Sequence, residues 1–316
     1  MNKPCSPLDF DKIKTYSIKD RKSLVSKDDF ALPWERGGSL SDFLDTLPSI
    51  LAGNDIKSVI QAIVQAVQNE KQVCFAMGGH VIKTGMNPLI IDLMKKKILT
   101  MISMNGSGII HDLEIAYTGR TSEDVAQSLG DGSFGMARET SALLNQAIKT
   151  ADRQSIGLGR AVGEMILSEN LPHKDLSLTA AGAMLDIPIT VHVAIGTDII
   201  HMHPDFDASA CGKASYQDFK TFASKISTLE KGVFINAGSA VIMPEVFLKA
   251  LTLVRNIGCS LDEFTTINLD FIRHYRPMTN VVNRPTKGKG KGYALVGHHE
   301  ILIPLIAAGV IESLEK

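Results

Sequence analysis

The sequence predicts an α/β fold with a doubly wound, mostly parallel sheet and helices on both faces. Short apolar runs without polar alternation recur along the chain, as expected of strands that are covered on both sides. Segments with helical spacing separate these runs, and glycine-containing turns follow most of them. This alternation predicts a parallel sheet, because right-handed crossovers place the connecting helices on both of its faces.

Two helices are predicted before the first strand. Ser39 or Ser41 can cap a helix over residues 42–51, and apolar residues recur at helical spacing over residues 56–68. The first strand is the apolar run Val73–Met77, which stops at a pair of glycines. Its lack of alternation is typical of a strand in the middle of a parallel sheet.

The rest of the chain repeats this pattern of strand and helix. A helix begins at Asn87-Pro88 and ends in three lysines at residues 95–97, where the helix dipole favours cations. Further helical stretches are expected at residues 109–116, 135–169 and 244–255. Further strands are expected at residues 98–103, 187–193, 232–236, 264–268 and 293–296.

The domain organisation is expected to be simple. Residues 37–316 hold no linker and should form a single α/β domain, whereas residues 1–36 are polar, charged and aperiodic and should form an arm that docks on a neighbouring subunit. The start of the chain lacks the apolar run of a secretory signal, and nothing later reaches membrane-spanning length. Four widely spaced cysteines without a CxxC pair fit a reducing, cytoplasmic compartment.

Overall charge excludes some classes of partner. The 33 basic and 34 acidic residues nearly cancel, so no whole-molecule field favours nucleic acid or a membrane surface. Small molecules and further copies of the same chain are therefore the expected partners. Ligands of doubly wound sheets bind at the carboxyl ends of the strands, which directs attention to the loops that follow the predicted strands.

Three of these loops are rich in glycine: Gly78-Gly79, Gly106-Ser107-Gly108 and Gly238-Ser239. None belongs to a GxGxxG fingerprint or a P-loop. A single such loop is explained by the tight turn that glycine permits. Three in one sheet favour a ligand site, because backbone N–H groups at helix starts suit phosphates.

Histidines gather at the same places. Six of the nine fall at or just beyond a predicted strand end, which suits acid/base chemistry or a metal. These six are His80, His111, His201, His203, His298 and His299. Asp112 and Asp198 also lie in strand-end loops, where a carboxylate can accept from ribose hydroxyls or from an amine.

The sharpest local cluster is His201-Met202-His203, followed by Asp205 and Asp207. An HxH pair that leaves a strand points both imidazoles to one side, within reach of the carboxylates. Three interpretations stay open at this point: a polar loop with hydrogen-bonded histidines, a contact with substrate or cofactor, and a metal site.

A basic loop, Thr286–Gly292, precedes the last predicted strand and alternates lysine with glycine. It is either a solvated loop or a source of one functional ammonium group from Lys287, Lys289 or Lys291. Such a group can hold a phosphate or carboxylate, or act as a nucleophile if burial lowers its pKa.

From about Gly78 to the C terminus, the order of these blocks resembles the deoxyhypusine synthase family. Asn105–Leu113 is similar to the family's TAGGxEEDL segment, and Ile235–Pro244 to its glycine-rich strand end followed by paired histidines. Ile267-Asn268 resembles its INTA turn, and Val296–Leu305 its last strand and helix. The resemblance implies a Rossmann-like NAD-binding fold and homotetramers with active sites at dimer interfaces.

The departures from the family pattern fall on its chemistry. Ile110 and His111 replace two glutamates, of which one holds the amine substrate in the family, and only Asp112 of that acidic triplet is kept. Met243-Pro244 stands in place of the catalytic histidine pair. Ile195–His201 stands where the family has TDGSxGD, and the tryptophan that precedes the family's Gly-Lys nucleophile is absent.

The resemblance and the residues together give a leading hypothesis: an NAD-dependent aminoalkyl transferase that acts on a polyamine-like or other small amine but does not make deoxyhypusine. In this hypothesis His111, His201, His203 and Lys289 carry the catalysis, and Asp112 and Asp198 hold the amine. The expected cofactor contacts are Gly78, Gly79, His80, Asn105, Gly106, Ser107, Gly238, Ser239, Asn268 and His298.

Two other classes of function stay open. The first is a metal-dependent hydrolase that uses His201, His203 and Asp205 or Asp207 as ligands, with a bound water as the nucleophile. The second is a nucleotide-binding protein without catalytic activity, which follows from the replaced histidine pair and glutamates. The leading hypothesis itself requires no metal.

Overall fold

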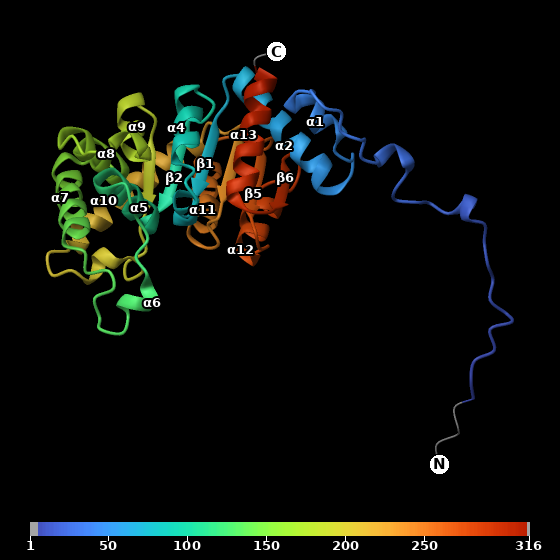
Figure 1. The fold of residues 1–316 in the computed structure, drawn as a ribbon, viewed down its shortest axis with the longest axis horizontal. Coiled ribbons are helices and arrows are strands. Elements are labelled where there is room, and N and C mark those ends of the chain that lie inside the picture. Colours follow the sequence, from blue (N-terminus) through green and yellow to red (C-terminus); the bar gives the residue numbers. More distant parts are fainter. Residues whose placement is uncertain (1–5, 315–316) are drawn as a thin grey trace.

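The computed structural model describes residues 6–314 and contains one six-stranded parallel sheet (Figure 1). The strands are β1 (Val73–Met77), β2 (Met101–Asn105), β3 (Ile189–His192), β4 (Val233–Ala237), β5 (Thr265–Asp270) and β6 (Lys291–Val296). Their order in space is β3-β2-β1-β4-β5-β6, and every neighbouring pair is parallel. The predicted α/β class and parallel sheet are confirmed.

Thirteen α-helices lie around the sheet in residues 6–314. They are α1 (Leu40–Thr46), α2 (Leu51–Gln68), α3 (Gly79–Lys83), α4 (Asn87–Lys95), α5 (Gly106–Thr118), α6 (Val125–Ser128), α7 (Arg138–Gln154), α8 (Leu158–Ser168), α9 (Leu178–Leu185), α10 (Ala208–Ile226), α11 (Ile242–Asn256), α12 (Tyr275–Pro277) and α13 (His299–Leu314). A six-residue π-helix follows α12 directly.

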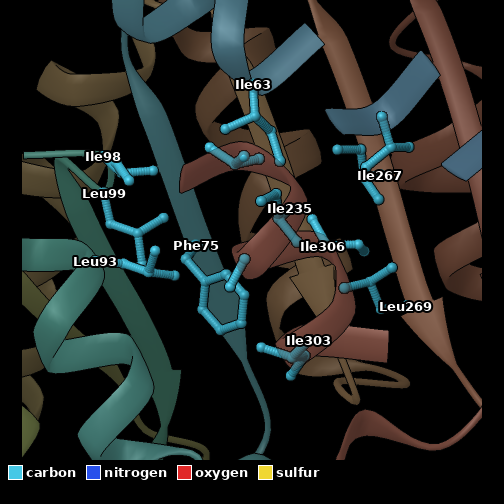
Figure 2. Close-up of a pocket in the computed structure, with 13 residues that line it drawn as sticks. Ile63, Phe75, Leu93, Ile98, Leu99, Ile235, Ile267, Leu269, Ile303 and Ile306 are labelled. Carbon is cyan, nitrogen blue, oxygen red and sulfur yellow. The ribbon is translucent and has the colours of Figure 1, made fainter. Parts of the chain in front are cut away.

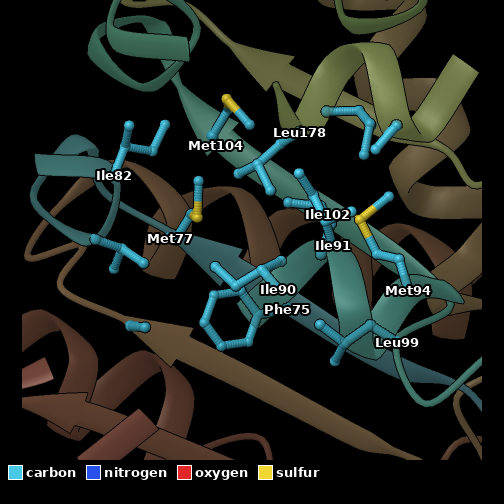
Figure 3. Packing of buried hydrophobic residues seen from close by; sticks show 14 of the residues in the cluster. Phe75, Met77, Ile82, Ile90, Ile91, Met94, Leu99, Ile102, Met104 and Leu178 are labelled. Atoms are coloured by element: carbon cyan, nitrogen blue, oxygen red, sulfur yellow. The ribbon is translucent and has the colours of Figure 1, made fainter. Parts of the chain in front are cut away.

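Alternating side chains of the central strands enter two separate cores. Phe75 and Met77 of β1 face one core, which α2, α4 and α13 cover, whereas Cys74 and Ala76 face the other, which α10 and α11 cover. Figure 3 shows Ile90 and Met94 of α4 packed beside β1 and β2. The absence of alternation in the sequence of β1 therefore follows from burial on both sides.

The first core leaves little free space. Figure 2 shows Ile303 and Ile306 of α13 directed toward Phe75 of β1 and Ile235 of β4. The cavity between them has a volume of about 30 Å³ and an entirely apolar lining. A void of this size and composition belongs to the core, and it offers no polar group to orient a ligand.

Helix boundaries differ from the prediction at one informative place. The helical stretch expected over residues 135–169 is divided into α7 and α8, because Ser155 adopts a left-handed conformation with φ 55°. Gly157 then passes so close to Asp218 that a β-carbon at Gly157 would lie 1.9 Å from its carboxylate. Periodicity alone could not reveal this turn, since apolar spacing resumes directly after it.

The N-terminal segment extends away from the body of the molecule (Figure 1). Residues 6–28 are exposed throughout, and the chain joins the body through hydrogen bonds from Leu32 N to Thr46 O and from Ser49 N to Asp29 O. Docking of this arm on a neighbouring subunit stays a prediction, and its residues 1–5 lie outside the described part of the chain. No helix within residues 6–314 has the length and apolar character needed to cross a membrane.

Candidate functional site

The order of strands reverses between β1 and β4, and the loops that leave these two strands touch each other. Gly78 N donates to Ala237 O at 3.0 Å, and a β-carbon added to Gly78 would lie 2.4 Å from the carbonyl oxygen of Gly238. Gly238 has φ +64°. Only glycine fits both conditions. We call the place where these two loops meet the crevice, because doubly wound sheets bind ligands at such a reversal of strand order.

Aromatic rings stand beside this crevice. His299 at the start of α13 is buried against Gly238, and its ring centroid lies 5.5 Å from that of the exposed His80. Phe271, after β5, lies 6.0 Å from His80 and stacks with His298 at 6.3 Å. Partial burial, together with nearby His299, lowers the pKa of His80 and favours its neutral form.

His299 holds an unpaired nitrogen at the same point. Its Nε2 lies 3.1 Å from Leu269 O, which can only accept, so Nε2 carries the proton. Nδ1 is therefore an acceptor, and it is buried without a partner among the described residues. Buried polar atoms are usually hydrogen-bonded, so this nitrogen is a candidate contact for a ligand.

The loop after β2 forms a second wall. Asn105 Oδ1 accepts from Gly108 N at 3.3 Å and from Ser107 Oγ at 3.0 Å, which caps the thirteen-residue helix α5. A β-carbon at Gly79 would lie 2.7 Å from Ser107 Oγ. The ends of β1 and β2 therefore meet as predicted, and the start of α5 lies at this edge.

His111 on α5 belongs to a hydrogen-bonded chain that the sequence did not reveal. Thr121 Oγ1 donates its proton to Glu114 Oε2 at 2.5 Å, so the 2.7 Å contact between Thr121 Oγ1 and His111 Nδ1 requires a proton on Nδ1. The Nε2 of a neutral His111 is then left with a free lone pair. His111 Cδ2, bonded to Nε2, would lie 3.0 Å from a β-carbon at Gly79, so this edge of the ring faces the crevice.

Glu114 fixes this arrangement. Burial by itself raises the pKa of Glu114, but nearby His111 and hydrogen bonds from Thr121 and Thr140 outweigh burial and hold the pKa below its usual value. The carboxylate is therefore ionised at neutral pH and acts only as an acceptor. The available signal was its position three residues after His111, which places both on one face of a helix.

Asp198 and His201 lie together above the start of α5. The carboxylate of Asp198 rests on Gly106, where a β-carbon would come within 1.9 Å of Oδ2. His201 Nδ1 accepts from Gly196 N and Asp198 N, both at 3.1 Å, so its proton is on Nε2. This Nε2 is buried without a hydrogen-bond partner in the described chain and lies 4.0 Å from Asp198 Oδ2.

Burial raises the pKa of Asp198 to about 6 and therefore predicts a pH-dependent stability. A carboxyl whose folded-state pKa exceeds its unfolded-state value favours folding when protonated, so stability falls as the pH rises from about 4 through 6. We expect Asp198→Asn to raise the free energy of unfolding at pH 8 by up to about 3 kcal/mol, with little effect at pH 4. Urea unfolding at both pH values measures this, with the exposed Asp205→Asn as control; equal gains at both pH values would contradict it.

His203 does not join His201. His201 lies within the 3-10 helix Ile199–Met202, and His203 directly follows it. Neither belongs to an extended strand, since β3 ends at His192. His203 Nε2 contacts Gly135 O at 2.8 Å, on the side of α7. The expectation that both imidazoles point to one side is wrong, because alternation holds only in extended backbone.

The proposed metal ligands are not gathered either. Asp207 caps α10 by accepting from Ala210 N at 2.9 Å, and Asp205 is exposed. Within residues 6–314, no three histidine, cysteine or acidic side chains are placed to hold a metal ion together. The geometry gives the metal-hydrolase hypothesis no ligand set.

Asp112 is a structural residue, which corrects its predicted role in holding the amine. The side chain is fully buried and accepts from Asn87 Nδ2, Ser177 Oγ, Leu178 N, Thr179 N and Thr179 Oγ1 at 2.7 to 3.2 Å. Five protein donors occupy its lone pairs and fix the start of α9. No acceptor capacity is left for a substrate ammonium group.

Two predicted cofactor contacts also lie inside the protein. Asn268 is buried in β5 and accepts from Asn236 Nδ2 of β4 at 2.7 Å. Ser239 Oγ accepts from Met243 N at 3.1 Å at the start of α11. Both side chains stabilise the loops around the crevice. The other eight predicted contacts, from Gly78 to His298, lie at the carboxyl edge.

Lys289 lies at the opposite edge of the sheet, which corrects its predicted place in the site. It precedes β6, whose first residue, Lys291, pairs with Thr265 at the start of β5. A strand of five residues spans roughly 16 Å. Within one chain, Lys289 therefore cannot reach the crevice at Gly78 and Gly238.

Comparison with known proteins supports the fold alone. No protein-family profile and no curated protein sequence matches this chain. A protein assigned as a deoxyhypusine synthase from Entamoeba histolytica has a similar structure, with 12% identity, a TM-score of 0.51, and coverage of 89% of this chain and 96% of that one. A conserved LOR/SDH protein from Methanococcus maripaludis S2 matches with 13% identity and a TM-score of 0.51, over 89% of this chain and 72% of that one.

A third similar structure is the ternary complex of AgrE with ornithine and NAD+. It has 12% identity and a TM-score of 0.54, over 85% of this chain but only 35% of AgrE. The chain thus spans about a third of the length of AgrE. The resemblance to deoxyhypusine synthases read from the sequence is confirmed at the level of the fold.

Proposed function

We propose that this chain binds NAD across the carboxyl edge of the sheet and carries out NAD-dependent chemistry on a small amine. The observation that carries the proposal is the glycine contact between Gly78 and Gly238 at the strand-order reversal, beside the rings of His80 and His299. A similar structure adds support, since AgrE forms a ternary complex with ornithine and NAD+.

The residues of the crevice fit the cofactor. Gly78, Gly79 and Gly238 let a dinucleotide approach the backbone, and the start of α5 at Gly106 and Ser107 offers N–H groups to an anion. His80, Phe271 and His298 supply rings for stacking, and the unpaired Nδ1 of His299 supplies an acceptor. When bound, NAD would accept a hydride from the carbon that bears the amine.

His111 is the residue we propose as the base. Its Nε2 lone pair is directed to the crevice side by the chain through Thr121 to Glu114, and ionised Glu114 would stabilise the imidazolium that forms when His111 takes a proton. The base His111 is thus oriented by Thr121, which is itself oriented by the carboxylate of Glu114. Glu114 and Thr121 are positioning residues in this proposal.

Asp198 is the residue we propose for the substrate ammonium group. Its carboxylate lies beside Gly106, and its protein donors come from its own loop, from Thr197 and from the backbone N–H of His201, whereas Asp112 accepts from five donors elsewhere in the chain. Burial raises the pKa of Asp198, and a bound cation would lower it again by stabilising the ionised carboxylate. Amine binding and ionisation of Asp198 therefore favour each other. His201 orients this loop.

The amine is not expected to become part of deoxyhypusine. Met243 and Pro244, which replace the family's histidine pair, are buried in the first turn of α11, and Met243 belongs to the second core. We therefore propose a different acceptor, within the aminoalkyl-transferase class, and a homo-oligomeric assembly, with a tetramer as the form that the resemblance implies.

Cofactor binding provides the first test. We expect calorimetric titration with NAD to show saturable binding, and Phe271→Ala to weaken it about tenfold, which is about 1.4 kcal/mol, because a stacking surface is lost. Tyr216→Ala removes another exposed ring, from α10, and should leave the affinity unchanged. Absence of NAD binding by the unmutated chain would overturn the proposal.

Turnover separates the catalytic proposal from the non-catalytic alternative. The unmutated protein is incubated with NAD and L-ornithine, L-arginine or spermidine, and reduced cofactor is followed by absorbance. Reduction with one of these amines supports an enzyme. NAD binding without reduction by any amine of the panel would favour the nucleotide-binding protein that lacks catalysis.

A further inference from the structure

The amino edge of the sheet, opposite the candidate site, contains a hollow of about 620 Å³. Four lysines line it: Lys71, Lys231, Lys289 and Lys291. The remaining polar lining comes from Gln65, Asn69, Thr265 and Glu263. This volume lies in the range of pockets that bind small molecules.

The fold itself brings these lysines together. Lys71 leads into β1, Lys231 leads into β4, and Lys289 and Lys291 lead into β6. Since β1, β4, β5 and β6 are consecutive parallel strands, the residues before them lie at one edge, with roughly 4.8 Å from strand to strand. Lys231, Lys289 and Lys291, which follow Lys71 by 160 to 220 positions in the sequence, thus line the same hollow as Lys71.

The positive charge of the hollow is not neutralised by the protein. In residues 6–314, no ion pair involves any of the four lysines. Glu263 is the one acidic residue of the lining, against four lysines. Like charges held close together destabilise the free protein, and an anion would remove that cost.

The lysine-glycine alternation has a structural cause that positions two of these lysines. A β-carbon at Gly292 would lie 2.1 Å from Val282 O, and one at Gly290 would lie 2.9 Å from Phe264 O. The backbone is therefore pressed against the protein at both glycines. Lys289 and Lys291 stay exposed beside them and line the hollow.

Lys231 lines the hollow from a strained backbone position. It has φ +61°, in the left-handed region that favours glycine. A lysine here carries a backbone cost that glycine would avoid, and its side chain lines the hollow.

We propose that this hollow is a binding site for a compact polyanion that carries two or more phosphate groups. Lysine ammonium groups bind phosphate as point charges, without the fixed planar geometry of arginine, so several together suit a cluster of phosphates. The site does not depend on the proposed function, because it lies at the other end of the strands. It also gives Lys289 a role that the candidate active site does not.

Calorimetric titration with inorganic tripolyphosphate at low salt tests this site. We expect saturable binding to the unmutated protein and at least tenfold weaker binding to the double variant Lys289→Gln/Lys291→Gln. The matched control is Lys149→Gln/Lys220→Gln, which removes the same charge from exposed positions on α7 and α10 and should change the affinity less than twofold. Far-ultraviolet circular dichroism confirms that both variants are folded.

Three outcomes would overturn the proposal. The first is no binding of tripolyphosphate by the unmutated protein. The second is an equal loss in both double variants, which would indicate diffuse attraction by surface charge. The third is a loss in Phe271→Ala but not in Lys289→Gln/Lys291→Gln, which would place the anion at the carboxyl edge. Absence of NAD binding alone would not contradict this inference, so the proposals for the two sites can be rejected separately.

Discussion

Replacing Asp112 with alanine is expected to lower the free energy of unfolding by about 3 to 5 kcal/mol. The buried carboxylate accepts five hydrogen bonds, from Asn87, Ser177, Leu178 and Thr179, and its removal leaves these donors unpaired away from water. The loss also removes the group that fixes the start of α9. Urea unfolding at a fixed protein concentration measures the effect.

Two further variants make this prediction specific. Asp112→Asn keeps one acceptor oxygen and should lie between the alanine variant and the unmutated protein. Asp45→Ala removes an exposed carboxylate from α1 and should change stability by less than about 0.5 kcal/mol. If Asp112→Ala proved as stable as the unmutated protein but failed to bind amines, Asp112 would be a substrate ligand after all.

Much of the fold was predictable because strands that are buried on both faces have continuous apolar sequences. Val73–Met77 lies in the centre of the sheet, and its boundaries are those predicted. The second strand is displaced: 98–103 was predicted, and β2 covers Met101–Asn105. Ile98 and Leu99 are apolar because they enter the core from the preceding loop, which an apolar run cannot distinguish from a strand.

The site was predictable where backbone chemistry decides it. Gly78 and Gly238 meet because each follows one of two adjacent parallel strands. Asp112 and His203 could not be assigned from sequence, because their roles depend on partners such as Thr179 and Gly135 that tertiary packing brings to them. Position near a strand end restricts where a side chain begins and says little about what it contacts.

The error for Lys289 has a topological cause. Residues that follow a strand of a parallel sheet lie at its carboxyl edge, and residues that precede one lie at its amino edge. The loop at residues 286–292 precedes β6, so chain order alone places it away from Gly78 and Gly238. The family resemblance suggested that this lysine belongs to the site. The direction of β6 places it at the opposite edge of the sheet within one chain.

Replacing His111 with alanine is expected to lower turnover of the amine by about 10² to 10⁴, while NAD affinity stays within a factor of three. General base catalysis by a positioned histidine contributes an effect of this size. The free lone pair at Nε2 exists because Glu114, through Thr121, requires the proton on Nδ1. His173→Ala, which removes an exposed histidine from another loop, serves as the control.

Glu114→Gln distinguishes a catalytic chain from a structural one. The amide can donate a proton to Thr121, so the tautomer of His111 is no longer fixed, and the negative charge that stabilises its imidazolium is lost. The variant should therefore reduce kcat about tenfold or more, while KM for the amine and the NAD affinity stay within a factor of three. Steady-state turnover, NAD titration and urea unfolding of the same variant test this. A loss of stability and of NAD affinity that accompanies the lower rate would mean that Glu114 only supports the fold, and full activity of His111→Ala would assign the base to another side chain of the crevice, such as His80.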